Sequence, residues 1–284
     1  MRSTPSIVNN VPQAETVRQI VLSALGEPAT RIALVEEQGN VNKAFDVTTR
    51  NGGLIVRVRF DRDEMRQFIR ERYCADVIRA QYDWTPEVIA IGKFERHSYS
   101  IQRKVLGTVA SHYGGDIAAV WEQVGRYAAC FHAIETPGYL NNMLQGQPVP
   151  SRAWCEPYFD CLGEAANSKL VAGGLLTEAE FEAGLKILSS LKNAEFKPTL
   201  AHGNLSLRNI IVDTDGRAHI IDWGSCQGHM AELLDLSELL AFDTPRDHVQ
   251  AYLRGHGLAT DYSEQNREVL ECLKLVRHVF LPEE

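Results

Sequence analysis

The chain has 284 residues, which is enough for one large domain or for two lobes that share a cleft. With 44% hydrophobic and 23% charged residues, the composition is typical of a soluble globular protein, and no apolar run approaches the roughly 20 residues that a membrane-spanning helix needs. The formal charge of -8 argues against a nucleic-acid binder and is compatible with plain solubility or with a cleft that attracts cationic substrates.

The first hundred residues predict about five strands and one intervening helix. Helical periodicity over 13–26 predicts a leading helix that ends at Gly26. The run Asn51-Gly52-Gly53 indicates a hairpin turn, because Asn and Gly accept positive φ. The intervening helix is expected from about Asp61 to Gln81. The strands are expected at 31–37, 43–49, 53–59, 86–92 and 97–103.

The pattern becomes mainly helical after Gly107. A long amphipathic helix is expected at 116–135, and a loop rich in Gly, Pro and Asn follows at 136–150. A strand-rich lobe over 1–104 and a helical lobe over 105–284 are therefore expected. The remaining predicted elements of the second lobe are helices at 151–167 and 177–193, a short hairpin of 209–213 with 218–223, and three helices after Met230.

Cysteine usage and the first residues predict a cytoplasmic protein. The six cysteines contain no CxxC pair, and no His/Cys group has zinc-ligand spacing, so free thiols in a reducing compartment are expected. The opening residues, MRSTPSIVNNVPQAE, lack the apolar core of a secretory signal. The cysteines are Cys74, Cys130, Cys155, Cys161, Cys226 and Cys272.

The stretch LAHGNLSLRNIIVD, residues 200–213, and the following IIDWG carry the most chemistry. Phosphoryl transfer requires groups that hold the phosphates, metal ligands, and a group that orients the acceptor hydroxyl. Asn209 and Asp222 flank a short hairpin, and an amide and a carboxylate can hold Mg²⁺ through oxygen. Asn204 and Asn209 are five positions apart across one loop, so both side chains can point into one cleft.

These segments resemble the aminoglycoside phosphotransferase and choline kinase superfamily, whose signature is HGDxxxxN, a short hairpin and IDW. The resemblance covers roughly residues 30–245 and is specific at 200–223. Hygromycin phosphotransferase looks nearest among the branches, through the segments 84–94 and 99–108. The resemblance implies an α+β, bilobal protein-kinase-like fold, with a small antiparallel-sheet N-lobe, a mainly helical C-lobe, and ATP with Mg²⁺ between them.

In the helical lobe, the resemblance makes Asn209 and Asp222 the metal ligands. His202 would support the loop by hydrogen bonds rather than react, and Arg208 would either face the phosphates or solvate the loop. Asp235 matches a frequent Asp of the family that caps a helix or ties the catalytic loop in place. His132 recurs in the family on a long helix, where a structural role is expected.

In the first lobe, the resemblance places Arg57 where kinases have a strand lysine, with Glu71 preferred over Glu64 as its partner on the helix. A loop within 36–47 could cover the phosphates, and the backbone near 102–105 would bind adenine. The candidate nucleotide-binding residues are Gly39, Asn40, Asn42, Arg57, Glu71, Gln102, Arg103 and Val105.

The family has Asp where this chain has Asn204. An amide can orient a hydroxyl through its oxygen, but it cannot take the proton, and a positioned general base is typically worth about 10²–10⁴ in rate. Three explanations stay open: a replaced base in a working enzyme, a natural pseudokinase that binds nucleotide and regulates, or another carboxylate acting as base. The first is favoured because every other element is retained.

The predicted function is ATP- and Mg²⁺-dependent O-phosphorylation of a small molecule, with a cationic aminoglycoside-type antibiotic as the leading acceptor. No nucleic acid and no membrane is expected as a partner, and a monomer and a homodimer fit equally. The sequence does not distinguish GTP from ATP or identify the acceptor. Glu156, Asp160 and Glu164, spaced four apart, are either acceptor ligands or a solvated helix face.

Overall fold

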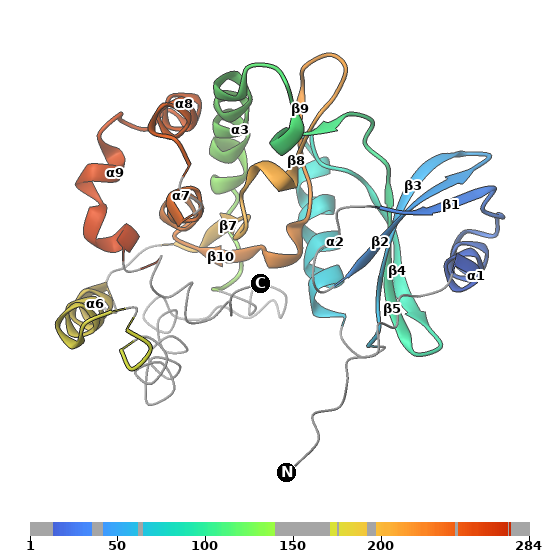
Figure 1. Ribbon diagram of the computed structural model, residues 1–284, viewed down its shortest axis with the longest axis horizontal. Coiled ribbons are helices and arrows are strands. Elements are labelled where there is room, and N and C mark those ends of the chain that lie inside the picture. Colours follow the sequence, from blue (N-terminus) through green and yellow to red (C-terminus); the bar gives the residue numbers. More distant parts are fainter. Residues whose placement is uncertain are drawn as a thin grey trace, which may run out of the picture. The chain divides into compact units, whose positions relative to one another are not determined.

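The chain folds into two compact units, Met1–Val105 and Leu106–Glu284 (Figure 1). The structure is a computed structural model. It describes residues 14–35, 42–61, 65–139, 171–174, 176–191, 197–241, 244–271 and 273.

The first unit is built on a five-stranded antiparallel sheet with the strand order β1-β2-β3-β5-β4. The strands are β1 (Arg31–Leu34), β2 (Lys43–Thr49), β3 (Gly52–Arg59), β4 (Val88–Phe94) and β5 (His97–Arg103), and the helices are α1 (Ala14–Leu25) and α2 (Arg66–Arg79). The five predicted strands and the intervening helix are therefore present, as the kinase-like fold requires.

The two helices of the first unit lie against opposite faces of the sheet (Figure 1). Successive side chains of a strand point to opposite faces, and β3 alternates buried and half-buried residues. Val56 belongs to the same buried cluster as Ile20 of α1. Its neighbour Arg57 points the other way and contacts Glu71 of α2. Because of this alternation, the apolar side chains of β3 form the core on one face of the sheet, and the Arg57 side chain lies on the other face.

The turn between β2 and β3 forms where it was predicted, but for a different reason. Only Gly52 of the Asn51-Gly52-Gly53 run has a positive φ, at 124°. Asn51 acts through its side chain instead, and its Nδ2 donates to Glu27 Oε2 at 2.7 Å. This bond ties the turn to the segment that follows α1, a contact that local sequence does not reveal.

Several element boundaries differ from the predictions. The helix expected over 61–81 is α2, which begins after Met65 and ends at Arg79. The strand expected from Pro86 begins at Val88 and carries a register shift before Ala90. Helix α3 begins after Asp116, whose side chain accepts from the Ala119 backbone N–H at 3.1 Å and caps the helix.

The second unit combines helices with two small antiparallel sheets. One sheet has the order β6-β8-β9, and β7 pairs with β10. The strands are β6 (Thr108–Val109), β7 (Thr199–Ala201), β8 (Ile210–Val212), β9 (Ala218–Ile220) and β10 (Gln227–His229). The helices are α3 (Ile117–His132), α6 (Glu178–Leu191), α7 (Ala231–Ala241), α8 (Arg246–His256) and α9 (Tyr262–Gln265).

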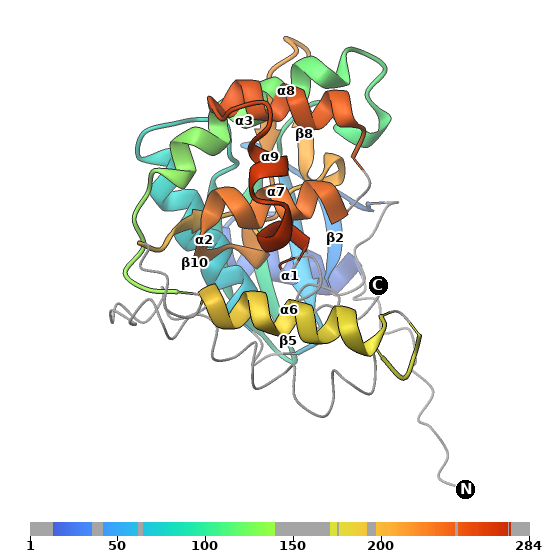
Figure 2. The same cartoon turned by 90° about the vertical axis from the view of Figure 1, so that its left-hand side faces the viewer.

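Helices α3 and α8 pack side by side at unusually short range (Figure 2). A Cβ at Gly125 of α3 would lie 2.2 Å from Tyr252 O, and a Cβ at Gly255 of α8 would lie 2.0 Å from Glu122 O. Only glycine permits these approaches, so each backbone rests directly on the other helix. This packing fixes the position of the last turn of α8 against α3.

Across the described ranges, none of the helices combines the length and the apolar character required to traverse a bilayer. The helix expected at 151–167 lies outside the described residues.

Candidate functional site

The loop after β7 contains His202, Gly203 and Asn204. Gly203 has φ +74°, and a Cβ there would lie 2.4 Å from Ser225 O, so the loop requires glycine. The His202 ring is buried and its Nδ1 accepts from the Asn204 backbone N–H at 3.3 Å. Its Nε2 therefore carries the proton and donates to Ile221 O at 3.0 Å. Burial lowers the pKa of His202, which keeps the ring neutral.

His202 thus connects the loop to the residue immediately before Asp222. This geometry suits the supporting role that the sequence predicted for His202, because both ring nitrogens are used to hold backbone groups.

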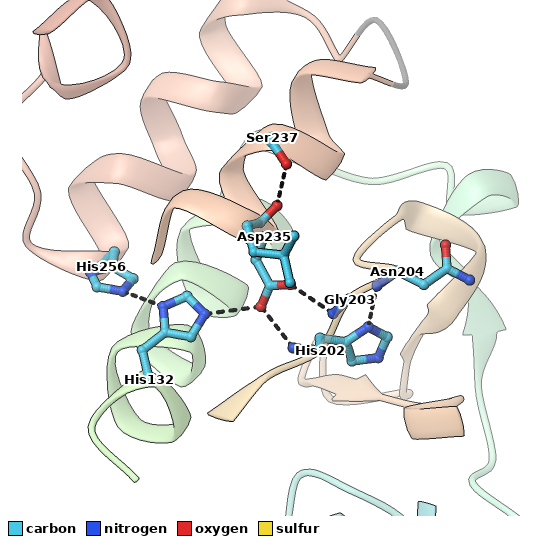
Figure 3. A network of polar contacts seen from close by, with 8 residues as sticks. His132, His202, Gly203, Asn204, Asp235, Ser237 and His256 are labelled. Atoms are coloured by element: carbon cyan, nitrogen blue, oxygen red, sulfur yellow. Dashed lines mark hydrogen bonds and ion pairs between the residues drawn. The ribbon is translucent and has the colours of Figure 1, made fainter. Parts of the chain in front are cut away.

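Asp235 anchors the same loop from within α7 (Figure 3). Its Oδ2 accepts from the His202 backbone N–H at 2.9 Å and its Oδ1 from the Gly203 backbone N–H at 2.8 Å. Burial alone would raise the pKa of Asp235, but the hydrogen bond from His132, with that from the Gly203 amide, holds it below its usual value. Of the two roles considered for Asp235, the structure shows the tie to the loop.

Asn209 and Asp222 lie at the same end of the β8–β9 hairpin. Ile210 pairs with Ile220, and the Ile221 backbone N–H donates to Asn209 O at 2.9 Å. The Asn209 Nδ2 donates to Asn204 O at 2.8 Å, which turns the amide nitrogen toward the loop and leaves Oδ1 as the candidate ligand atom. An amide oxygen and a carboxylate are the hard ligands that Mg²⁺ prefers.

Asp222 has a strained backbone. Its φ and ψ are 62° and 56°, in the left-handed region that non-glycine residues rarely adopt. Within the described ranges, Glu95 is the other non-glycine residue with positive φ. Such conformations persist where the surrounding structure imposes them, and they concentrate at functional sites. The predicted ligand position is therefore one where the fold imposes an uncommon geometry.

Asn204 is fixed by its backbone rather than by its side chain. Its N–H donates to His202 Nδ1 and its carbonyl accepts from Asn209 Nδ2. The half-buried side chain points away from the His202–Asp235 contacts in Figure 3. Arg208, one residue before Asn209, is exposed, so its two suggested roles both stay open.

The first unit brings Arg57 and Glu71 together. The distance between Arg57 Nη1 and Glu71 Oε1 is 2.6 Å, and the two side chains are 13% and 3% exposed. A buried pair of this kind holds the guanidinium in one orientation, which suits a fork for phosphate. The competing partner, Glu64, lies outside the described residues.

The remaining candidate nucleotide-binding residues of the first unit have separate contacts. Asn42 is buried, and its Nδ2 donates to Gln67 Oε1 of α2 at 3.3 Å, so it is held rather than adaptable. Gln102 is buried in β5, and the Arg103 backbone N–H already donates to Glu87 O at 2.9 Å. Val105 is the last residue of the first unit. Gly39, Asn40, Glu156, Asp160 and Glu164 lie outside the described residues.

His256 is a residue of the site that sequence reasoning missed. Its Nε2 lies 2.9 Å from His132 Nδ1, although the two residues are 124 positions apart. No motif or periodicity links α8 to the loop, so the sequence held no signal for this contact.

Buried histidines give the second unit a defined acid sensitivity. Burial lowers the pKa of His229 to about 4, from 6.5. The folded state therefore binds fewer protons than the unfolded state between these values, and stability is complete above pH 6.5 and is lost as the pH falls toward 4. We expect urea unfolding at pH 4.5 to show about 2 kcal/mol less stability from this group than at pH 7.

His229→Gln should flatten that pH dependence by the same amount, whereas exposed His112→Gln should keep the original slope. An unchanged slope in His229→Gln would show that the imidazole is not the neutral, buried group described here.

Comparison with known proteins adds three findings. A model of the family described as "Phosphotransferase enzyme family" matches residues 36–267. No curated protein matches the sequence. Solved structures match over most of their length, and at these low identities they establish the protein-kinase-like fold alone.

Three solved structures illustrate the match. A thermostable mutant of aminoglycoside phosphotransferase APH(4)-Ia, in a ternary complex with ADP and hygromycin B, has 18% identity and a TM-score of 0.70, covering 93% of this chain and 89% of that chain. A GDP complex of a mutant aminoglycoside 2'-phosphotransferase-IIIa has 15% identity and a TM-score of 0.68, covering 94% and 89%. Spectinomycin phosphotransferase APH(9)-Ia with ADP and spectinomycin has 14% identity and a TM-score of 0.62, covering 96% of each.

Proposed function

Because the chain belongs to the phosphotransferase enzyme family, we propose that it is an ATP- and Mg²⁺-dependent O-phosphotransferase acting on a hydroxyl of a small molecule. The proposed acceptor class is the cationic aminoglycoside-type antibiotics. Two observations support that class: similar folds are solved with hygromycin B and with spectinomycin, and the chain carries a formal charge of -8. GTP is a second candidate donor, since one similar structure is a GDP complex.

One observation carries the proposal: Asn204, Asn209 and Asp222 are joined by short backbone contacts into one compact loop and hairpin. The Asn209 side chain bonds the Asn204 carbonyl, and the Asn209 carbonyl bonds the residue before Asp222. A hydroxyl-orienting group and two oxygen ligands are thereby held by mutually dependent contacts. Catalysis of phosphoryl transfer depends mainly on holding the reacting groups close together in a fixed orientation.

When bound, the nucleotide with its metal supplies the electrophilic phosphorus and neutralises the charge on the phosphates. In our proposal, Asn209 Oδ1 and the Asp222 carboxylate would hold the metal as oxygen ligands. Within the first unit, Glu71 orients the Arg57 guanidinium, which is the proposed phosphate-binding group of that unit. Asn204 accepts a hydrogen bond from the acceptor hydroxyl through its amide oxygen but leaves the proton in place.

The amide at position 204 therefore limits turnover without removing nucleotide binding. This supports a working phosphotransferase that has lost one group, since the Arg57–Glu71 pair and the Asn209 contacts are all in place. The competing hypothesis is a natural pseudokinase with a regulatory role. The two hypotheses differ in whether a carboxylate at position 204 restores catalysis.

Nucleotide binding is the first test. We expect calorimetry to detect ATP binding in the presence of Mg²⁺, and Asp222→Ala to weaken the Mg²⁺-dependent affinity by about tenfold or more, because it removes a proposed ligand. Asp215→Ala, in the exposed turn of the same hairpin, is the matched control and should bind as the unmodified chain does. A complete lack of ATP and GTP binding would indicate an interaction protein that does not use nucleotide.

A further inference from the structure

A chain of four hydrogen bonds runs from the end of α8 to the loop that carries Asn204 (Figure 3). His256 Nε2 lies 2.9 Å from His132 Nδ1, and His132 Nε2 lies 2.9 Å from Asp235 Oδ2. Asp235 in turn accepts from the backbone N–H groups of His202 and Gly203. The His132 and Asp235 side chains are 2% and 0% exposed, so water does not compete for the three bonds that Asp235 accepts.

The direction of each bond follows from the acid at the centre. Asp235 is an ionised carboxylate with three donors, so His132 Nε2 carries a proton and donates to it. In the neutral His132 ring Nδ1 is then an acceptor, and His256 Nε2–H donates to it. His256 therefore fixes both the tautomer and the rotation of the His132 ring, which an imidazole with one partner would not maintain.

Close packing of α8 against α3 holds His256 in place beside His132. Gly255, the neighbour of His256, brings α8 into direct backbone contact with α3, the helix that ends at His132. One turn earlier, the buried Tyr252 ring contacts the Trp121 ring of α3 edge to face, with centroids 6.3 Å apart. Both histidines thus stand on helices that cannot slide past each other without breaking close packing.

We propose that His256 is a positioning residue for the Asn204 loop and that it acts through His132 and Asp235. The anchoring of the loop by His256 does not depend on which reaction the protein catalyses. Only the expected effect of this anchoring on phosphoryl transfer rests on the proposed function. His256 touches no candidate ligand or reacting group in the described structure, so its effect is on the loop amides.

Amide hydrogen exchange in the ¹⁵N-labelled full chain tests the anchoring. His256→Leu removes both ring nitrogens and should speed exchange at the His202 and Gly203 amides by about tenfold relative to Ile220 of β9. His256→Gln keeps a donor and should restore slow exchange at both amides. Arg254→Gln, a change on the exposed face of the same helix, is the matched control and should exchange as the unmodified chain does.

Two results would overturn the proposal. Unchanged exchange at His202 and Gly203 in His256→Leu would show that the histidine does not hold the loop. An equal acceleration at Ile220 would show general destabilisation instead of positioning. Neither result depends on catalysis, so a failure here is distinct from a failure of the proposed function. If Asn204→Asp is active, adding His256→Leu should lower kcat and leave KM for ATP unchanged.

Discussion

Asn204→Asp is expected to raise the turnover number by about 10²–10⁴, because the carboxylate can take the proton that the amide leaves on the acceptor hydroxyl. The backbone groups of residue 204 are held by His202 and Asn209, so the new side chain should occupy the position of the old one. Asn and Asp are nearly isosteric, and nucleotide affinity should therefore change little. The measurement is a steady-state assay of ADP release.

That assay should use a panel of aminoglycosides, choline-like alcohols and sugars, because the acceptor pocket is not defined by the described residues. Asn204→Ser is the matched control: it keeps a small polar group but supplies no base, and it should stay as slow as the unmodified chain. If Asn204→Asp binds nucleotide with Mg²⁺ and remains inactive against the whole panel, the chain is better explained as a nucleotide-binding regulator.

Asp235→Ala is expected to cost about 3–5 kcal/mol of unfolding free energy, the second large effect. The carboxylate accepts from His132 and from the His202 and Gly203 amides, and alanine would leave these buried donors without an acceptor. Urea unfolding followed by Trp fluorescence is a suitable measurement, since the Trp223 ring lies 4.6 Å from the His202 ring, centroid to centroid.

Two further variants make this result interpretable. Asp235→Asn retains one acceptor oxygen and should lose less stability than Asp235→Ala, which keeps the test valid if the alanine variant does not fold. Glu264→Ala removes an exposed partner of Arg246 and should change stability by no more than about 0.5 kcal/mol. Equal stability of Asp235→Ala and Glu264→Ala would contradict the anchoring role.

Much of the fold could be predicted because its signals are local. Alternating burial along β3 and the helical period of α3 are properties of adjacent residues, and the strands and helices followed from them. The Asn209–Asp222 arrangement is also local, since a short hairpin must return the chain to the position it left. The sequence was less able to place element ends, because caps and bulges such as the one before Ala90 depend on neighbouring strands.

The sequence by itself indicated the kinase-like class of fold, which the structure confirms, and it contains an amide at the expected base position. Its assignment of Asn209 and Asp222 as metal ligands stays a prediction. The sequence also preferred Glu71 as the partner of Arg57, and the structure shows this pair. Only the tertiary structure decided between the two roles expected of Asp235, because it shows the carboxylate bound to the loop amides. It alone showed that His256 reaches His132 across 124 positions. The physical reason is that periodicity reports which face of an element is apolar, whereas the partner of a buried polar group depends on how distant helices pack.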